Sequence, residues 1–272
     1  SDCAEIAGFY ALVDPDGPCC KVANAVSTGD PHITTFYGKH YTLLRQGTFL
    51  SWEYKKTFHP RGGQVLKSKN EVDWKIFTHY SGRGSFTKGL LMLDDSLGFR
   101  QQALQMTSEE CQLRAMRSQD EKGPGGEWLT VEKSTFFPGH GNSTAINVTF
   151  LENTHSKFFQ FLIDTEHGLK EVAKLKVTCS PSGHMLNTWM SMHGKDLHFV
   201  QGQLGAKTFQ KGAASLLATN SSAQDIADEE FRTSKTWTEL GGSKAAALFL
   251  ENSDQHGLNL IQMVPCTQAE KQ

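Results

Sequence analysis

The sequence predicts an all-β fold, an antiparallel two-sheet β-sandwich with long loops and short peripheral helices. From Ile33 onward, short runs of β-branched and aromatic residues are separated by Gly, Asn, Asp and Ser residues, a pattern typical of successive antiparallel strands. Several of these runs alternate apolar and polar residues with the two-residue period of a half-buried strand. Residues 224–232 and 244–250 have a helix-forming composition, and we expect them to form the short peripheral helices.

The predicted strands begin with a meander of three neighbouring runs, at residues 33–37, 41–44 and 48–54. In the third run, Leu50, Trp52 and Tyr54 fall on one face by the two-residue period, which predicts that this face is buried. The alternation returns further along the chain, at Val72, Trp74, Ile76, Thr78 and Tyr80, at Ile146, Val148 and Phe150, and more loosely at 158–164 and 169–178.

The segment 108–120 leaves two interpretations open. A serine followed by two glutamates at Ser108 resembles a helix start, whereas Cys111, Leu113 and Ala115 alternate like a strand.

We expect one main domain over residues 28–266, a disulfide-tethered N-terminal segment at 1–27 and a polar tail at 267–272.

Composition and charge exclude several classes of protein. Hydrophobic residues make up 38% of the chain and aromatic residues 10%, which is enough to build a packed core. Lys and Arg number 27 against 29 Asp and Glu, so nothing in the net charge favours binding to nucleic acid. No apolar run is long enough to span a membrane. The first residues lack the pattern of a signal peptide, so we expect a mature protein or a fragment.

The cysteines and sequons indicate an oxidising compartment. The six cysteines are Cys3, Cys19, Cys20, Cys111, Cys179 and Cys266. They form no zinc-ligand pattern, and we expect all six in disulfides, with at least one bridge from the N-terminal segment to the main domain. Six cysteines allow 15 pairings, which the sequence leaves open. N-glycosylation sequons at Asn142, Asn147 and Asn220 lie in polar stretches that predict surface loops.

The sequence shows no motif that indicates an enzyme. The sequence contains no HExxH zinc motif and no G-x-S-x-G nucleophile elbow. The acidic pairs Asp94 with Asp95 and Asp164 with Glu166 have no visible catalytic partner, and we interpret them as solvated turns at strand ends. Most aromatic residues fit core packing rather than a ligand platform.

One motif resembles a known family. Residues 29–38 read GDPHITTFYG and are followed by Tyr41 and by Gly47-Thr48-Phe49. This run resembles the opening of the von Willebrand factor type D domain. Further along, Gly-Gln-Leu-Gly at 202–205 is similar to the family's Gly-Leu-Cys-Gly-Asn, and the acidic segment 228–231 is similar to its Asp-Asp-Phe.

This resemblance implies a two-sheet sandwich found in extracellular multidomain proteins. The expected function is that of a secreted, non-catalytic structural or adhesion module, whose partners are other extracellular proteins or copies of the same chain. The alternatives are a luciferase-like oxidoreductase or a lipid-carrier module built on the same type of domain. No cofactor is expected.

The departures from the family pattern bear on calcium and on disulfides. Where calcium-binding members have oxygen ligands, this chain has Tyr37, Ala206 and the pair Asp228-Glu229. The loss of two ligand side chains predicts a weak or absent calcium site, because calcium needs six to eight oxygens. Phe49 and Leu204 also stand where the family has cysteines.

The resemblance also implies a self-cleavage site at the Asp30-Pro31 bond, which family members with this sequence can break without a protease. Asp30 would form a cyclic anhydride with its own main-chain carbonyl and expel the prolyl nitrogen. His32, the residue after Pro31, is suited to supply the proton. The other interpretation is a tight turn before the first strand, with no chemistry, since cleavage requires backbone strain.

Overall fold

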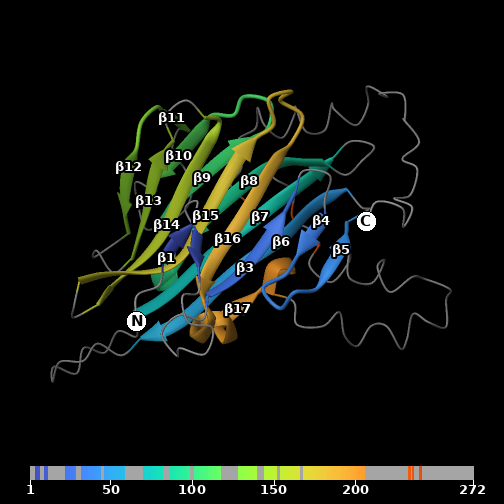
Figure 1. Ribbon diagram of the computed structural model, residues 1–272. Coiled ribbons are helices and arrows are strands. Elements are labelled where there is room, and N and C mark those ends of the chain that lie inside the picture. Colours follow the sequence, from blue (N-terminus) through green and yellow to red (C-terminus); the bar gives the residue numbers. More distant parts are fainter. Residues whose placement is uncertain are drawn as a thin grey trace, which may run out of the picture.

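The computed structural model is a two-layer β-sandwich, which confirms the predicted fold class. One antiparallel sheet has eight strands and the other has seven, and they lie face to face (Figure 1). The structure describes residues 4–6, 9–11, 22–28, 32–43, 46–58, 70–81, 86–98, 101–117, 128–139, 144–151, 154–165, 168–205, 232–233, 235 and 239–240. Within these ranges, no helix has the length and apolarity needed to cross a membrane.

The eight-stranded sheet forms one layer. In spatial order its strands are β12 (Thr135–Pro138), β13 (Thr144–Phe150), β14 (Ser156–Thr165), β15 (Gly168–Cys179), β16 (Leu186–His193), β3 (Val22–Ser27), β4 (His32–Thr34) and β5 (His40–Thr42). β3 pairs with both β16 and β4, so residues 22–27 belong to the sandwich. The domain boundary predicted at residue 28 places these residues in the N-terminal segment instead. A separate small sheet pairs β1 (Ala4–Ile6) with β2 (Phe9–Ala11).

The seven-stranded sheet forms the other layer. Its spatial order is β11 (Leu129–Val131), β10 (Leu113–Arg117), β9 (Gln102–Thr107), β8 (Phe86–Asp94), β7 (Asn70–Ser81), β6 (Gly47–Phe58) and β17 (Val200–Gln201). The short 3-10 helices are η1 (Ser96–Gly98), η3 (Gly194–Phe199) and η4 (Gln203–Gly205).

Two of the sequence interpretations concern helices. Segment 108–120 contains a turn followed by β10, so its strand interpretation is correct where the structure describes it. The predicted helices at 224–232 and 244–250 lie outside the described residues except for Arg232, which forms an isolated β-bridge with Phe49 instead.

The core lies between the two sheets and is centred on aromatic rings. Trp52 and Trp74 on the seven-stranded sheet each pack against Phe161 of the eight-stranded sheet, with ring centroids 5.1 and 5.4 Å apart. Tyr54 stacks on both tryptophans, at 6.1 and 5.8 Å. The alternation predicted along β7 and β13 is confirmed, because the apolar residues of the pattern are buried in this core or pack against it.

The prediction that Leu50 shares a face with Trp52 and Tyr54 is wrong. A β-bulge shifts the register between Leu50 and Trp52. The extra residue, Ser51, turns the chain so that Phe49 enters the inner core and Leu50 packs on the outer side of the sheet.

The first two strands of the meander are shorter than predicted. β4 ends at Thr34 because the chain turns at residues 35–38, where Gly38 adopts a left-handed backbone with φ of 70°. β5 covers His40–Thr42, and the residue after it, Leu43, is fully buried.

The outer face of the seven-stranded sheet is also apolar and covered. Phe77, Leu91, Leu93, Ala103, Met116 and Leu240 form a second buried cluster there, and Leu50 and Trp128 pack against it. Neighbouring residues of β8 are therefore buried on opposite faces. Leu240, from the C-terminal part of the chain, contributes to this cover.

A disulfide joins the two sheets. Cys111, in the turn between β9 and β10, is bonded to Cys179 at the end of β15, with the Cα atoms 5.9 Å apart. Lys157 donates a hydrogen bond of 2.8 Å from Nζ to the main-chain carbonyl of Cys111, and burial lowers the pKa of Lys157. The other four cysteines lie outside the described residues, so their oxidation and the N-terminal bridge stay predictions.

Replacing Cys111 and Cys179 together by Ala should lower the free energy of unfolding by about 4 kcal/mol. The bond closes a loop with a sequence separation of 68 residues, and its loss returns that conformational freedom to the unfolded chain. Urea unfolding of the oxidised protein and of the double variant measures the difference. A loss below about 1 kcal/mol would show that the bond contributes little of this constraint.

Candidate functional site

The turn that carries the GDPH motif joins β3 to β4. Thr28 N donates to the His32 carbonyl at 3.1 Å, so residues 29–31 are the three that lie between these hydrogen-bonded positions. Asp30 and Pro31 are outside the described residues. His32 is exposed, and its Nδ1 lies 2.9 Å from Thr42 Oγ1 on β5. The imidazole is thus held on the β4–β5 hairpin while it remains open to solvent.

The turn after β4, which carries the end of the 29–38 motif, lies beside the second motif segment. Phe36 N donates to the Leu204 carbonyl at 2.9 Å, although the two residues are far apart in the sequence. Thr35 is fully buried, and its Oγ1 accepts hydrogen bonds from the main-chain N–H groups of Tyr37 and Lys39 at 3.3 and 3.2 Å. These bonds fix the turn that follows β4 against η4.

The bulge in β6 completes this junction. Gly202 has φ of 93°, and a Cβ there would come within 2.8 Å of the Leu50 carbonyl oxygen, so glycine allows the backbones to approach. Ser51 Oγ donates to Gln203 Oε1 at 3.1 Å and also bonds Thr78 Oγ1. The two motif segments and the bulge form one buried contact between the sheets.

The predicted degenerate calcium site is only partly described. Tyr37 lies half-buried in the turn after β4, whereas Ala206, Asp228 and Glu229 are outside the described residues. In the part of the chain that the structure covers, no group of three or more His, Cys, Asp or Glu residues is arranged to hold a metal ion.

Of the three sequons, the structure describes Asn147, and it lies in a strand rather than in the expected loop. Ile146 and Val148 point into the core, so Asn147 between them points to the outer face of β13. Its Nδ2 donates to Gln160 Oε1 at 2.7 Å, and Gln160 Nε2 donates to Glu171 Oε2 at 2.7 Å. Asn142 and Asn220 are outside the described residues.

Asp94 differs from its expected role as a solvated turn residue. It is fully buried at the end of β8, where Thr144 Oγ1 on β13 donates to its Oδ2 at 2.9 Å and Ser96 N donates to its Oδ1 at 3.1 Å. Burial raises the pKa of Asp94, and these donors partly offset that effect. Its neighbour Asp95 bonds Lys75 Nζ at 3.3 Å. Asp94 therefore fastens the two sheets together.

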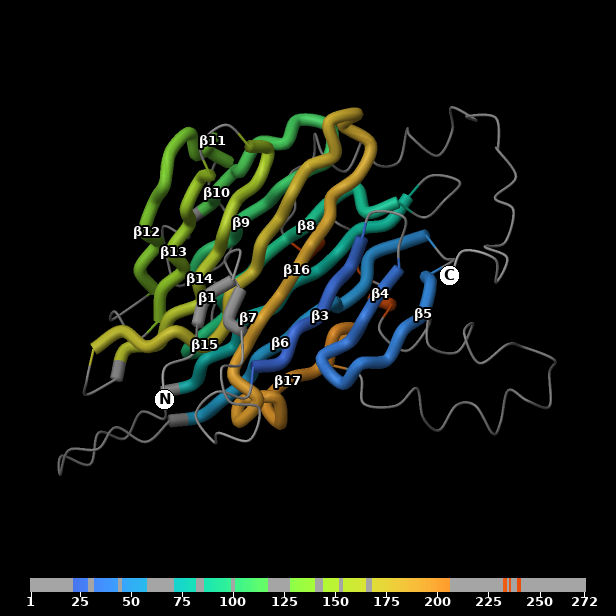
Figure 2. The backbone as a smooth tube through the Cα atoms, viewed as in Figure 1, coloured from blue at the N-terminus to red at the C-terminus, as the bar shows by residue number. Residues whose placement is uncertain are grey.

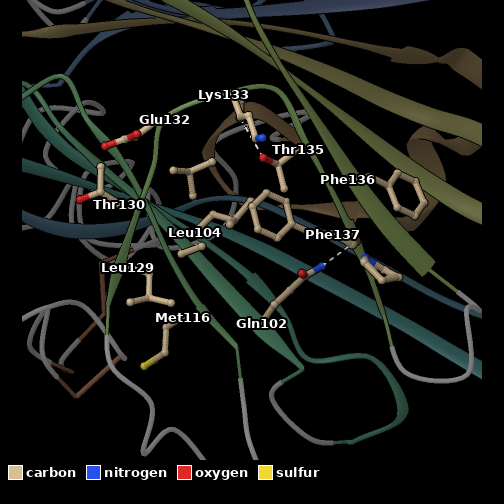
Figure 3. Close-up of a pocket in the computed structure, with 13 residues that line it drawn as sticks. Gln102, Leu104, Met116, Leu129, Thr130, Glu132, Lys133, Thr135, Phe136 and Phe137 are labelled. Carbon is tan, nitrogen blue, oxygen red and sulfur yellow. Dashed lines mark hydrogen bonds between the residues drawn. The ribbon is translucent and has the colours of Figure 1, made fainter.

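An apolar groove opens at one edge of the sandwich. It has a volume of about 630 Å³ and is lined by residues of β9, β10, β11, β12 and the β11–β12 connection. Figure 3 shows Leu129 and Met116 on one side of the groove and Phe137 on another. Leu129 and Phe136 are large apolar residues with 62% and 47% of their surface exposed. The groove presents apolar surface to solvent between the edge strands of the two sheets.

The polar residues that line the groove are Gln102, Thr130, Glu132, Lys133 and Thr135. Gln102 Nε2 donates to the Phe137 carbonyl at 3.4 Å, and Thr135 Oγ1 donates to the Lys133 carbonyl at 2.8 Å. Apolar residues make up the rest of the lining. The groove therefore offers an apolar surface with several polar groups at its margin.

The sequence carried little signal for this groove, because it arises where the edges of two different sheets meet. The signal that the sequence does contain is the pair Leu129 and Phe136, two exposed apolar residues on either side of Glu132-Lys133.

A scan of the chain against protein-family models finds no match, and a search among curated proteins finds no relative. The likeness to the von Willebrand factor type D domain accordingly stands on the motif residues themselves.

Proposed function

We propose that this chain is a divergent von Willebrand factor type D domain that acts as a secreted, non-catalytic structural module of an extracellular assembly. The observation that carries this proposal is the disulfide between Cys111 and Cys179, which ties the two sheets together. Structural disulfides of this kind persist in oxidising compartments and are rare in the cytosol.

The junction between the turn after β4 and η4 supports the family assignment. Phe36 of the 29–38 motif bonds directly to Leu204 of the Gly-Gln-Leu-Gly segment, so the two segments that resemble the family are in contact. A chance likeness at two distant places in the sequence gives no reason for the two segments to touch. The partners expected for such a module are other extracellular proteins or further copies of the chain.

In the cells that produce it, the protein should be found outside the cell with its cysteines oxidised. The reason is that the sandwich incorporates a bond that a reducing cytosol would not maintain. Immunodetection in extracellular and intracellular fractions measures where the protein is located. Thiol titration of the denatured protein measures how many cysteines are free. Recovery from the cytosol with two or more free thiols would contradict the proposal.

Self-cleavage at Asp30-Pro31 is part of the proposal. Attack by the Asp30 carboxyl on its own main-chain carbonyl forms the anhydride, the bond to Pro31 breaks, and the prolyl nitrogen takes up a proton. Incubation of the folded protein at about pH 5 to 6, where acid favours proton transfer to the prolyl nitrogen, should yield a fragment beginning at Pro31. A denaturing gel under reducing conditions and mass spectrometry detect it.

The topology adds a second expected outcome. The fragment before the broken bond contains β3, which pairs with β16 and β4, so the two fragments should stay together in native size-exclusion chromatography. Asp30→Asn is the control, because it keeps the size of the side chain and removes the carboxyl. Equal cleavage in that variant, or an intact wild-type chain after several days, would rule out this chemistry.

A second candidate function, carriage of a small apolar ligand such as a fatty acid, is favoured by the groove at the β11–β12 edge. Its volume falls within the usual range of small-molecule sites, which is about 300 to 1,000 Å³. The exposed Leu129 and Phe136 would be covered by such a ligand.

Replacing Leu129 by Gln should weaken the binding of a fluorescent fatty acid about tenfold, because the variant loses apolar surface that the ligand would cover. Leu169→Gln is the matched control, since Leu169 is also an exposed leucine, at 52%, and lies outside the groove on β15. Fluorescence titration gives both affinities. If wild-type protein binds no fatty acid, or both variants lose binding equally, the groove does not serve this function.

A further inference from the structure

Phe136 is an aromatic residue on the outer face of the eight-stranded sheet, and it is only partly covered. Its neighbour Phe137 packs against the inner core, so the alternation along β12 turns Phe136 to the opposite side. Figure 3 shows the two rings pointing to opposite sides of the strand. Phe136 has 47% of its surface exposed, whereas phenylalanine is among the residues most often buried in a folded protein. The sheet thus presents a large apolar ring to solvent.

The residue directly opposite Phe136 is the sequon residue Asn147. The two are partners in the antiparallel register of β12 and β13, strands that lie side by side on the left of the molecule in Figure 2. In the same register Gly139 N donates to the Thr144 carbonyl at 2.7 Å. Because hydrogen-bonded and non-hydrogen-bonded pairs alternate, Phe136 and Asn147 form a pair of the second type. The Cβ atoms of opposite residues are closest in such pairs, at about 4.5 to 5.5 Å, so the ring and the amide are neighbours on one face.

Asn147 is held by a hydrogen bond that is compatible with modification of its amide. Its Nδ2 donates to Gln160 Oε1 on β14 at 2.7 Å, and Gln160 Nε2 donates in turn to Glu171 Oε2 on β15 at 2.7 Å. A side-chain amide carries two N–H groups. An N-linked sugar replaces one of them, so the other can keep the bond to Gln160. This bond would fix the direction in which the sugar leaves the sheet.

The rest of the sequon lies on the same face of the sheet. Thr149, its third residue, is exposed and follows Asn147 by the two-residue period of a strand. Asn147 itself is half-buried. The strand beside it, β12, is the edge strand of its sheet, so a sugar on Asn147 can extend over Phe136 and into solvent.

We propose that Asn147 carries an N-linked glycan and that the first N-acetylglucosamine of this glycan packs on the ring of Phe136. The C–H groups on one face of the sugar contact the ring, which removes apolar surface of both from water. The hydroxyl groups at the rim of the sugar stay in solvent. The presence of the glycan rests on the proposed secretion, because the modification belongs to secreted proteins. The contact with Phe136 rests on the cross-strand pair.

The test is a double-mutant cycle on the melting temperature of the full chain, produced in a secreting eukaryotic cell with a signal peptide supplied. Mass spectrometry of the peptide that contains Asn147 should find this residue glycosylated. Thr149→Ala removes the sequon and keeps Asn147, and it is made both with Phe136 present and in a Phe136→Thr background. Loss of the glycan should lower the melting temperature by about 2 to 4 °C more when Phe136 is present, the shift expected for one aromatic contact in a protein of this size. The cycle cancels the direct effect of each single substitution.

Leu169→Thr is the matched control background, because Leu169 is also large, apolar and exposed, at 52%, on the same sheet but pairs with Asp164 instead of the sequon. In this background Thr149→Ala should cost as much as in the wild type. The proposal is overturned if Asn147 is unmodified, or if Thr149→Ala costs the Phe136→Thr background as much as the wild type. Because a signal peptide is supplied, neither result depends on where the natural protein resides. The fractionation of producing cells tests the proposed secretion separately.

Discussion

The packing of aromatic rings between the two sheets is the interaction on which the rest of the structure depends. Trp52, Tyr54, Trp74 and Phe161 are almost completely buried, and each large apolar side chain removed from water contributes about 2 to 3 kcal/mol. The rings reach one another only if their strands present the same face inward. The register of β6 and β7 follows from that requirement, and the bulge at Ser51 is where β6 adjusts to it.

Around this core, specific contacts fasten the perimeter of the sandwich. Asp94 bonds Thr144, Cys111 is bridged to Cys179, and Phe36 bonds Leu204, and each of these pairs joins one layer to the other. At the β11–β12 edge, by contrast, the bond described between the layers is the 3.4 Å contact from Gln102 to the Phe137 carbonyl. The layers separate there, and the groove is the consequence.

Features that depend on the periodicity of a single strand were predicted correctly from the sequence. Features that depend on a residue far away in the sequence were missed. The alternation along β7 is a property of one strand, and it was predicted correctly. The outward position of Leu50 depends on how β6 pairs with β7, and the burial of Asp94 depends on a threonine from the other sheet. The choice of Cys179 as the partner of Cys111 likewise required the two layers to be brought together, because spacing alone leaves every pairing open.

The distribution of buried and exposed residues also indicates where on the surface to look for a functional site. The side chains of Phe49, Trp52, Tyr54, Trp74 and Tyr80 are buried in the core, so these aromatic residues are not available at the surface for binding. Accessible features among the described residues include His32 at the start of β4 and the groove at the β11–β12 edge. A rigid interior with distinct features on its perimeter suits a protein that contacts several partners at once, since each contact can form without disturbing the core.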